Sequence, residues 1–193
     1  MKKLLLSLAV CAAMGMSMNA SANDHSVTVG YAQSKFPVLD LGNVTLKGVN
    51  FKYRYEGDSS VSLITSLTYM GNNISYSGDD SYRQKVNVDE KYRNLSLAAG
   101  PAYRFNEFVS IYGLAGLNVF DSKYAQKTHT SNGKTENESG HFRTSSFMYG
   151  AGIQINPMAN LVLDIGYEGT QKSFGDNSKL KLNGFNVGVG YRF

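Results

Sequence analysis

The chain has 193 residues, of which 42% are hydrophobic and 12% aromatic, and its mean hydropathy is −0.27. Such a chain does not hold several membrane-spanning helices of about 20 apolar residues each, so a helical transporter or channel is excluded. Its 13 Tyr, 10 Phe and 20 Gly, against 3 Pro, are typical of many short strands separated by turns. The composition therefore predicts an all-β protein.

The first residues have the features of a secretory signal peptide. Two lysines precede an apolar run over residues 4–18, and small residues end the segment at Ala22. We predict cleavage after Ala22, which leaves residues 23–193 as one domain. The only cysteine, Cys11, lies in the segment predicted to be removed. A lipoprotein cysteine is the alternative interpretation, but Val10 stands where that signal needs a small residue.

The formal net charge is +4 at pH 7, and two of the positive charges belong to the predicted signal peptide. The remaining charge is small for a chain of this length. We therefore expect no nucleic-acid partner, because a nucleic-acid-binding domain gathers many Lys and Arg side chains on one face.

Alternation with a period of two residues recurs eight times in residues 23–193 and predicts eight strands. One face of each run carries large apolar and aromatic side chains, whereas the other carries mainly Gly, Ala and Ser with isolated charged residues. The fifth run is the least regular, because Leu114 lies on its polar face. The runs lie at residues 26–31, 49–55, 61–69, 95–105, 109–119, 147–155, 161–168 and 185–193.

The content of these two faces separates two kinds of β-barrel. A soluble sandwich or lipocalin-like barrel turns its apolar face inward, where charged groups are costly. Here the face with small residues and few charges suits a narrow interior, and the aromatic face suits lipid. The pattern predicts an eight-stranded antiparallel transmembrane β-barrel of the bacterial outer membrane. A soluble lipocalin-like barrel is the alternative.

The connections between the runs alternate strictly between short and long. Outer-membrane barrels have short periplasmic turns and long external loops, so both termini are predicted to be periplasmic. The long connections are rich in Gly, Ser, Asn, Asp and Thr, and we expect structureless loops with mobile tips. The short connections lie at residues 56–60, 106–107 and 156–160, and the long ones at 35–47, 71–90, 121–141 and 170–179.

The interior of an eight-stranded barrel is just wide enough to be filled by its own side chains, so an open channel is not expected. Three even-numbered strands end in a Tyr-Arg-aromatic triplet, which brings three arginines to one membrane interface. The charged residues of the polar face are predicted to pair in the lumen, because pairing compensates for desolvation. They are Lys52, Arg54, Glu56, Arg104, Asp164, Glu168 and Arg192.

We predict no catalytic, cofactor-binding or metal site. Asp164 and Glu168 have the chemistry of a general acid and base, but no substrate could reach between them inside the barrel. His129 and His141 lie in the third long connection without a carboxylate or thiol at ligand spacing. The Gly-x-Gly sets lack a third glycine and a following helix, so they are not nucleotide-binding loops.

Six sequence blocks, in order along the chain, resemble one protein family. They lie at residues 30–34 (GYAQS), 52–56 (KYRYE), 99–104 (AGPAYR), 110–113 (SIYG), 149–152 (YGAG) and 188–193 (GVGYRF). The chain is similar to the Ail/Lom/OmpX family of eight-stranded enterobacterial outer membrane proteins. Residues 183–187 (NGFNV) bring it closest to the virulence-associated PagC and Rck branch. The resemblance covers all eight runs and is weakest in the long connections.

The resemblance implies adhesion and invasion, serum resistance or intracellular survival through host cell-surface, matrix or complement-regulatory proteins. Outer membrane lipid and lipopolysaccharide are the expected surroundings. The alternative is a structural envelope protein without a specific host ligand. The resemblance also implies that the barrel-assembly machinery takes up the last strand through Phe185, Val187, Val189, Tyr191 and Phe193.

The second and third long connections are the longest, and we predict that they carry the interaction. The second is acidic overall and the third mildly basic, so contact with a partner is expected to be partly electrostatic. Tyr92 and Phe142 are predicted to be additional exposed anchors. A solvated loop of mixed charge is the alternative. The candidate residues are Tyr82, Arg83, Lys85, Lys123, Tyr124, Lys127, His129, Lys134 and Arg143.

Overall fold

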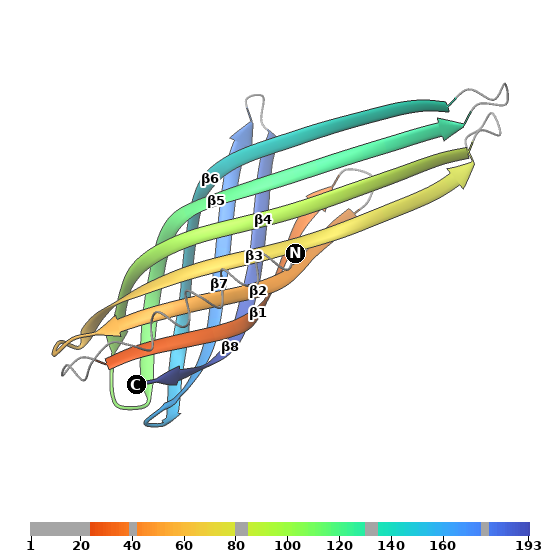
Figure 1. The fold of residues 1–193 in the computed structure, drawn as a ribbon. Helices are drawn as coiled ribbons and strands as arrows, with labels where there is room; N and C mark the ends of the chain where they lie inside the picture. The colour runs from red at the N-terminus through yellow and green to blue at the C-terminus, as the bar shows by residue number, and fades with distance from the viewer. Residues whose placement is uncertain (1–23, 39–41, 80–84, 130–134, 175–177) are drawn as a thin grey trace.

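The chain forms a closed antiparallel β-barrel in which every strand pairs with its sequence neighbours and β8 pairs with β1 (Figure 1). The computed structural model describes residues 24–38, 42–79, 85–129, 135–174 and 178–193, without the side chains of a few residues beside the gaps. The strands are β1 (Asp24–Val38), β2 (Gly42–Glu56), β3 (Val61–Asp79), β4 (Lys85–Arg104), β5 (Val109–His129), β6 (Thr135–Met158), β7 (Leu161–Phe174) and β8 (Ser178–Arg192).

The eight-stranded all-β prediction is confirmed, and the two faces of each strand lie as the alternation predicts. Leu97, Leu117 and Phe147 are register partners on β4, β5 and β6, and 62%, 68% and 60% of their surfaces are exposed. Successive side chains of a strand point to opposite faces, so their neighbours point into the lumen. There Asn50, Lys52 and other polar residues are buried. Among the described residues, no helix is long and apolar enough to cross a membrane.

The expectation of long structureless loops is wrong. Strand pairing continues outward to Asp79↔Lys85 in the β3–β4 hairpin and to His129↔Thr135 in the β5–β6 hairpin. The pairing satisfies the backbone N–H and C=O groups of these segments. Both faces of the outer strands can be polar once they leave lipid, so the two-residue alternation that identifies the inner strands is lost there. The tips at 80–84 and 130–134, predicted to be mobile, lie outside the described residues.

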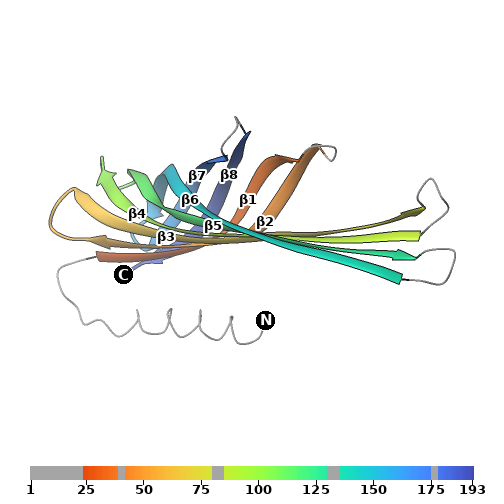
Figure 2. The ribbon, with the colours of Figure 1, turned by 90° about the horizontal axis from the view of Figure 1, so that it is seen from above.

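The outer parts of β3, β4, β5 and β6 form an open four-stranded sheet beyond the closed barrel (Figures 1 and 2). We call this sheet the platform and define it as residues 71–79, 85–93, 121–129 and 135–143. Within the described residues, β2 pairs with β3 no further than Lys47↔Gly71, and β6 pairs with β7 no further than Met148↔Thr170. The outer parts of β3 and β6 are therefore the two edges of the platform, each with a strand partner on one side only among the described residues.

An apolar cluster fills the lumen at the platform end of the barrel, where the sequence predicts a polar interior. The Phe36 ring centroid lies 5.3 Å from that of Tyr92 and 5.4 Å from that of Phe120. Tyr92 is 7% exposed, so its prediction as an exposed anchor is wrong. We call the apolar cluster at the platform end the mouth cluster. It consists of Ala32, Phe36, Val44, Leu46, Met70, Tyr92, Phe120 and Leu182.

A second cluster explains the irregular fifth run, because Leu114 packs inside the barrel with Ile64, Tyr112 and Met148.

Candidate functional site

Three arginines meet one carboxylate at the end of the lumen opposite the platform. Arg104 donates two hydrogen bonds from Nη2 to Glu56, at 2.7 Å to Oε1 and 2.6 Å to Oε2. Arg54 Nε lies 3.2 Å from Oε1, and Arg192 Nη2 lies 3.4 Å from Oε2. Arg192 also contacts Asp24. We call these four residues, Glu56 with Arg54, Arg104 and Arg192, the arginine hub.

A second buried group joins β2, β5, β6, β7 and β8 across the lumen. Lys52 forms an ion pair with Asp164 and donates a 2.5 Å hydrogen bond to Asn186 Oδ1. Tyr112 Oη and Gln154 Nε2 each donate to Asp164 at 3.1 Å. Three strands, β2, β5 and β6, therefore supply donors to the Asp164 carboxylate on β7, and Asn186 on β8 supplies an acceptor to Lys52. The arrangement holds opposite walls of the barrel together.

Glu168 does not form the ion pair with a lumenal cation that the sequence predicts. Its carboxylate accepts hydrogen bonds from the Thr68 hydroxyl at 2.9 Å and from the Ser66 hydroxyl at 3.2 Å. Asn186 Nδ2 donates at 3.3 Å and Asn50 Nδ2 at 3.4 Å. No cation of the described residues lies within 4 Å of it. A cavity of about 10 Å³ beside Glu168 leaves room for no more than a single water molecule.

The predicted assembly segment closes the barrel. Its apolar side chains point outward along β8, and residues 183–192 of β8 pair with residues 26–35 of β1. Phe193 N donates to His25 O at 2.9 Å, and His25 N donates to Phe193 O at 2.8 Å. The two rings stack with centroids 5.8 Å apart. The role of this segment in assembly stays a prediction, as does signal cleavage after Ala22, which lies outside the described residues.

The structure separates the interaction candidates into three groups. Tyr82, Arg83 and Lys134 lie outside the described residues. Lys85 and His129 are register partners at the outer end of the platform, and their side chains are not described. The remaining candidates lie on paired strands of the platform, with exposed side chains, and are Lys123, Tyr124, Lys127 and Arg143.

The register adds two cationic side chains, those of Lys91 and Arg93, and the imidazole of His141 to these candidates. Lys91, Lys123 and His141 are consecutive partners across β4, β5 and β6. The next row toward the barrel contains Arg93, Asp121 and Arg143. Residues at both rows share one outward face, because they occupy alternate positions of each strand. The sequence interpretation missed Lys91 and Arg93, which only the register between the two hairpins brings beside Lys123.

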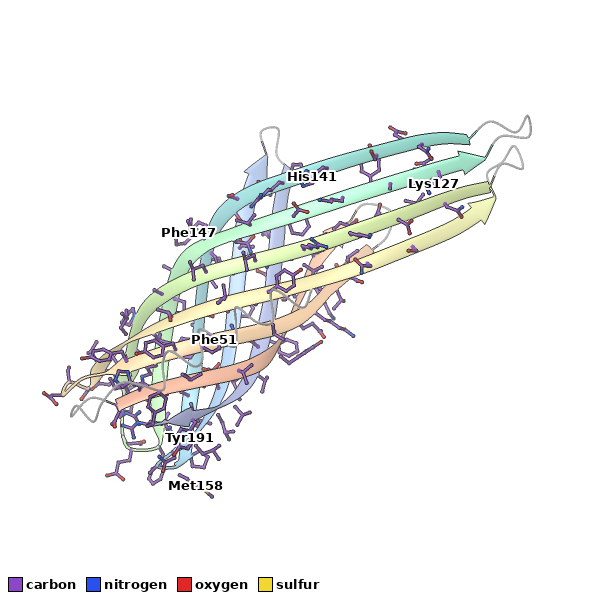
Figure 3. All side chains as sticks on the ribbon, viewed as in Figure 1. Phe51, Lys127, His141, Phe147, Met158 and Tyr191 are labelled. Carbon is purple, nitrogen blue, oxygen red and sulfur yellow. The ribbon has the colours of Figure 1, made fainter. Side chains whose placement is uncertain are left out.

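Asp121 and His141 are joined by a hydrogen bond within this face. His141 Nε2 lies 2.7 Å from Asp121 Oδ2. The side chain of His141 is 51% exposed and that of Asp121 is 22% exposed. The hydrogen bond from His141 lowers the pKa of Asp121, and the charges of Lys123 and Arg143 act in the same direction. Figure 3 shows His141 on the platform between Phe147, toward the barrel, and Lys127, farther out.

The next row of outward side chains toward the barrel is apolar or aromatic. Tyr69, Leu95 and Val119 are register partners there, one outward row closer to the barrel than Arg93 and Asp121. A surface hollow of about 200 Å³ spans both rows and is lined by residues that include Tyr69, Arg93 and Asp121. The cationic face therefore lies directly above the apolar surface of the barrel.

Comparison with known proteins gives the family. The model of the family described as "Enterobacterial Ail/Lom protein" matches residues 1–193. The chain is 42% identical to the virulence membrane protein PagC of Salmonella typhimurium, and the similarity covers 100% of both chains.

Solved structures agree with this relationship. The crystal structure of Ail, the attachment invasion locus protein of Yersinia pestis, is 30% identical, with a TM-score of 0.68 over 89% of this chain and 99% of that chain. The same protein in complex with the heparin analogue sucrose octasulfate is 31% identical, with a TM-score of 0.64 over the same shares. Proteins of this kind reside in the bacterial outer membrane, include virulence-associated members and are not enzymes. The chain belongs to the enterobacterial Ail/Lom family of outer membrane β-barrel proteins.

Proposed function

We propose that this protein is a virulence-associated surface protein whose platform mediates contact with the host, in adhesion and invasion, serum resistance or intracellular survival. The observation that carries the proposal is the platform itself, an open sheet that continues β3, β4, β5 and β6 beyond the closed barrel. Closing the barrel does not require this sheet, because a two-residue turn can join antiparallel strands.

The platform has two features that suit contact with another molecule. Within the described residues, the outer parts of β3 and β6 have a strand neighbour on one side only, and an extended segment of a partner can add to such an edge. Its outward face carries Lys91, Arg93, Lys123 and Arg143. Cationic faces attract anionic partners and increase the rate of encounter.

The partners follow from this surface and from the relatives. The complex of Yersinia pestis Ail with a heparin analogue supports a sulfated glycan among the ligands. Host cell-surface, matrix and complement-regulatory proteins are the other proposed partners. Lipopolysaccharide and the barrel-assembly machinery are the proposed partners within the envelope.

The test is a variant with a shortened platform, expressed in a non-adherent bacterial strain. Residues 73–91 and 123–141 are each replaced by Asn-Gly, which joins the register partners Asn72 with Tyr92 and Ser122 with Phe142. The variant also carries Arg93→Gln and Arg143→Gln, so that none of the four cations of the outward face remains. The control replaces residues 173–179 by Asn-Gly in the same way, joining Lys172 with Leu180 in the other external hairpin. Surface abundance and the shift in electrophoretic mobility on boiling establish that each barrel has assembled.

We expect the shortened platform to abolish attachment to host cells and survival in serum, and the control to retain both. If the variant with the shortened platform attaches and survives like the intact protein, the proposal is wrong. The protein is then the structural envelope protein of the alternative hypothesis.

A further inference from the structure

The arginine hub contains more positive than negative charge. Its three guanidinium groups surround the carboxylate of Glu56, which is 5% exposed. Arg192 also contacts Asp24, whose side chain is 54% exposed. No other carboxylate of the described residues, the C-terminal one included, forms an ion pair with these arginines. Three positive charges therefore meet two negative charges, of which only that of Glu56 is buried.

Two nitrogen atoms of the hub are buried and unpaired within the described part of the chain. Arg54 is 1% exposed and donates from Nε to Ser62 Oγ at 2.8 Å and from Nη1 to Gln154 Oε1 at 3.0 Å. Its Nη2 and the Nε of Arg192 have no hydrogen-bond partner among the described residues. Both atoms can only donate, and an unpaired buried donor costs free energy.

Two buried hydroxyl groups beside the hub, those of Thr28 and Ser110, also lack a partner in the ranges that the structure describes. Thr28 lies on β1, between the strands that carry Arg54 and Arg192. Ser110 lies on β5 and is the register partner of Arg104. The four unpaired groups therefore come from β1, β2, β5 and β8, and each of them has a hydrogen to donate.

A surface hollow of about 350 Å³ adjoins the hub at the end of the barrel opposite the platform. It is lined by Glu107, Phe108, Asn156, Met158, Ala159 and Arg192. The mouth cluster fills the lumen at the platform end, so we expect a small solute to reach the hub from this side. Asn156 Oδ1, a buried acceptor without a partner among the described residues, suits water and not an anion. The candidate site is therefore the hub, and the hollow is its entrance.

We propose that the arginine hub binds one small monovalent anion, such as chloride, as its third negative charge. The inference goes beyond the proposed function, because the platform takes no part in it. An anion accepts hydrogen bonds, and the four unpaired groups can all donate them. Its single charge balances the surplus of the hub. A water molecule would accept the same hydrogen bonds but would leave a positive charge uncompensated in the interior, which is costly.

The first test measures the thermal unfolding of the full chain in zwitterionic detergent while sodium chloride replaces sodium gluconate, whose anion is too large for a buried site. Ionic strength stays constant, so the screening of exposed charges does not change. The shift in electrophoretic mobility separates folded from unfolded barrels. We expect Tm to rise by about 2–5 °C and to saturate with chloride, because a ligand that binds only the folded state stabilises it by mass action.

Matched variants locate the site. Asp24→Asn removes the exposed carboxylate and leaves two positive charges uncompensated, so the half-saturating chloride concentration should fall by about threefold to fivefold. The control is Asp58→Asn in the β2–β3 turn at the same end of the barrel, since Asp58 is exposed and forms no ion pair with a described residue. It should not change the response. Thr28→Val keeps the charge of the hub but removes one unpaired hydroxyl, and it should raise the half-saturating concentration.

The second test grows crystals with bromide in place of chloride and locates the bromide by anomalous diffraction. We expect a peak within hydrogen-bond distance of Arg54 Nη2 or Arg192 Nε.

A Tm independent of chloride overturns the inference, as does the same chloride response in Asp24→Asn and Asp58→Asn. A bromide peak at the hub without a chloride-dependent Tm marks an adventitious ion only and also overturns it. Water alone at both nitrogen atoms has the same consequence. Neither test involves the platform, so a failure here leaves the proposed function unchanged.

Discussion

Glu56 shows how single residues keep charge inside this barrel. The carboxylate is 5% exposed and meets three guanidinium groups that come from the ends of β2, β4 and β8. Guanidinium groups keep their protons in proteins, so these three charges cannot be neutralised by proton loss. Among the described residues, Glu56 is the only ionic partner of Arg54 and Arg104, whereas Arg192 also pairs with Asp24. The arginine hub therefore ties the ends of three strands together.

Glu56→Gln is expected to lower the free energy of unfolding by about 3 kcal/mol or more, because removing one member of a buried ion pair leaves the partner charges uncompensated. The measurement is urea unfolding in detergent micelles, followed by the mobility shift on boiling. Asp24→Asn is the control, since the Asp24 side chain is 54% exposed and its loss should cost less than about 1 kcal/mol. Equal stability of the two variants would contradict a structural role for the hub.

Among the strands, β5, β6 and β7 pack around the ring of Tyr112, which occupies space left by two glycines. Tyr112 extends from β5 into the lumen, and a Cβ built at Gly152 on β6 would lie 2.3 Å from its hydroxyl oxygen and 2.5 Å from Ile165 O on β7. A Cβ at Gly166 would lie 2.5 Å from the same hydroxyl. These two glycines leave the space that Tyr112 needs to donate to Asp164.

Gly152→Ala is expected to destabilise the barrel by about 1–3 kcal/mol, the usual cost of overpacking, because the Ile165 backbone cannot move aside. Thermal unfolding followed by the mobility shift measures this loss. Gly113→Ala provides the matched control on β5, since a Cβ there meets nothing within 4 Å. A loss of similar size in both variants would show that alanine in a strand, rather than the Tyr112 slot, is responsible.

The end of β8 is the other element whose contacts carry a prediction. Deletion of Phe193 removes two backbone hydrogen bonds to His25 and one stacked ring at the junction of β1 and β8. An unclosed junction exposes two strand edges. We expect the deletion to reduce the amount of assembled barrel in the outer membrane and to increase periplasmic degradation. Phe193→Tyr, which keeps the ring and the main chain, should assemble normally, and undiminished assembly of the deletion would refute the prediction.

In the whole molecule, the lumen is filled along its length by three successive layers. The arginine hub closes one end, the Lys52 and Asp164 group lies in the middle, and the mouth cluster around Phe36, Tyr92 and Phe120 fills the platform end. Apolar side chains at the mouth and paired charges below it occupy the lumen among the described residues. We therefore expect the barrel to support the platform and not to serve as a pore.

Purified protein in planar lipid bilayers is accordingly expected to give no stepwise ion conductance, because an eight-stranded barrel is filled by its own side chains. The control is a 16-stranded porin, which has a water-filled channel, reconstituted by the same procedure. Reproducible unitary currents from the wild-type protein would show that the lumen opens and would contradict this description.

The sequence by itself determined the strand number, the two faces and the lumenal position of Lys52, Arg54 and Glu56. Within a membrane, lipid on one side and a narrow interior on the other force a two-residue alternation that is visible in the sequence. Buried charges need compensation, so isolated Lys, Arg, Asp and Glu on the polar face pointed to pairing.

Tertiary structure alone decided the platform and its charged face. Beyond the lipid, water surrounds both faces of a strand, so no alternation is required and paired strands have the composition of loops. The meeting of Lys91, Lys123 and His141 depends on the register between two hairpins, which distant residues set. Tyr92 is buried for the same reason, because Phe36 and Phe120 reach it only when the barrel closes.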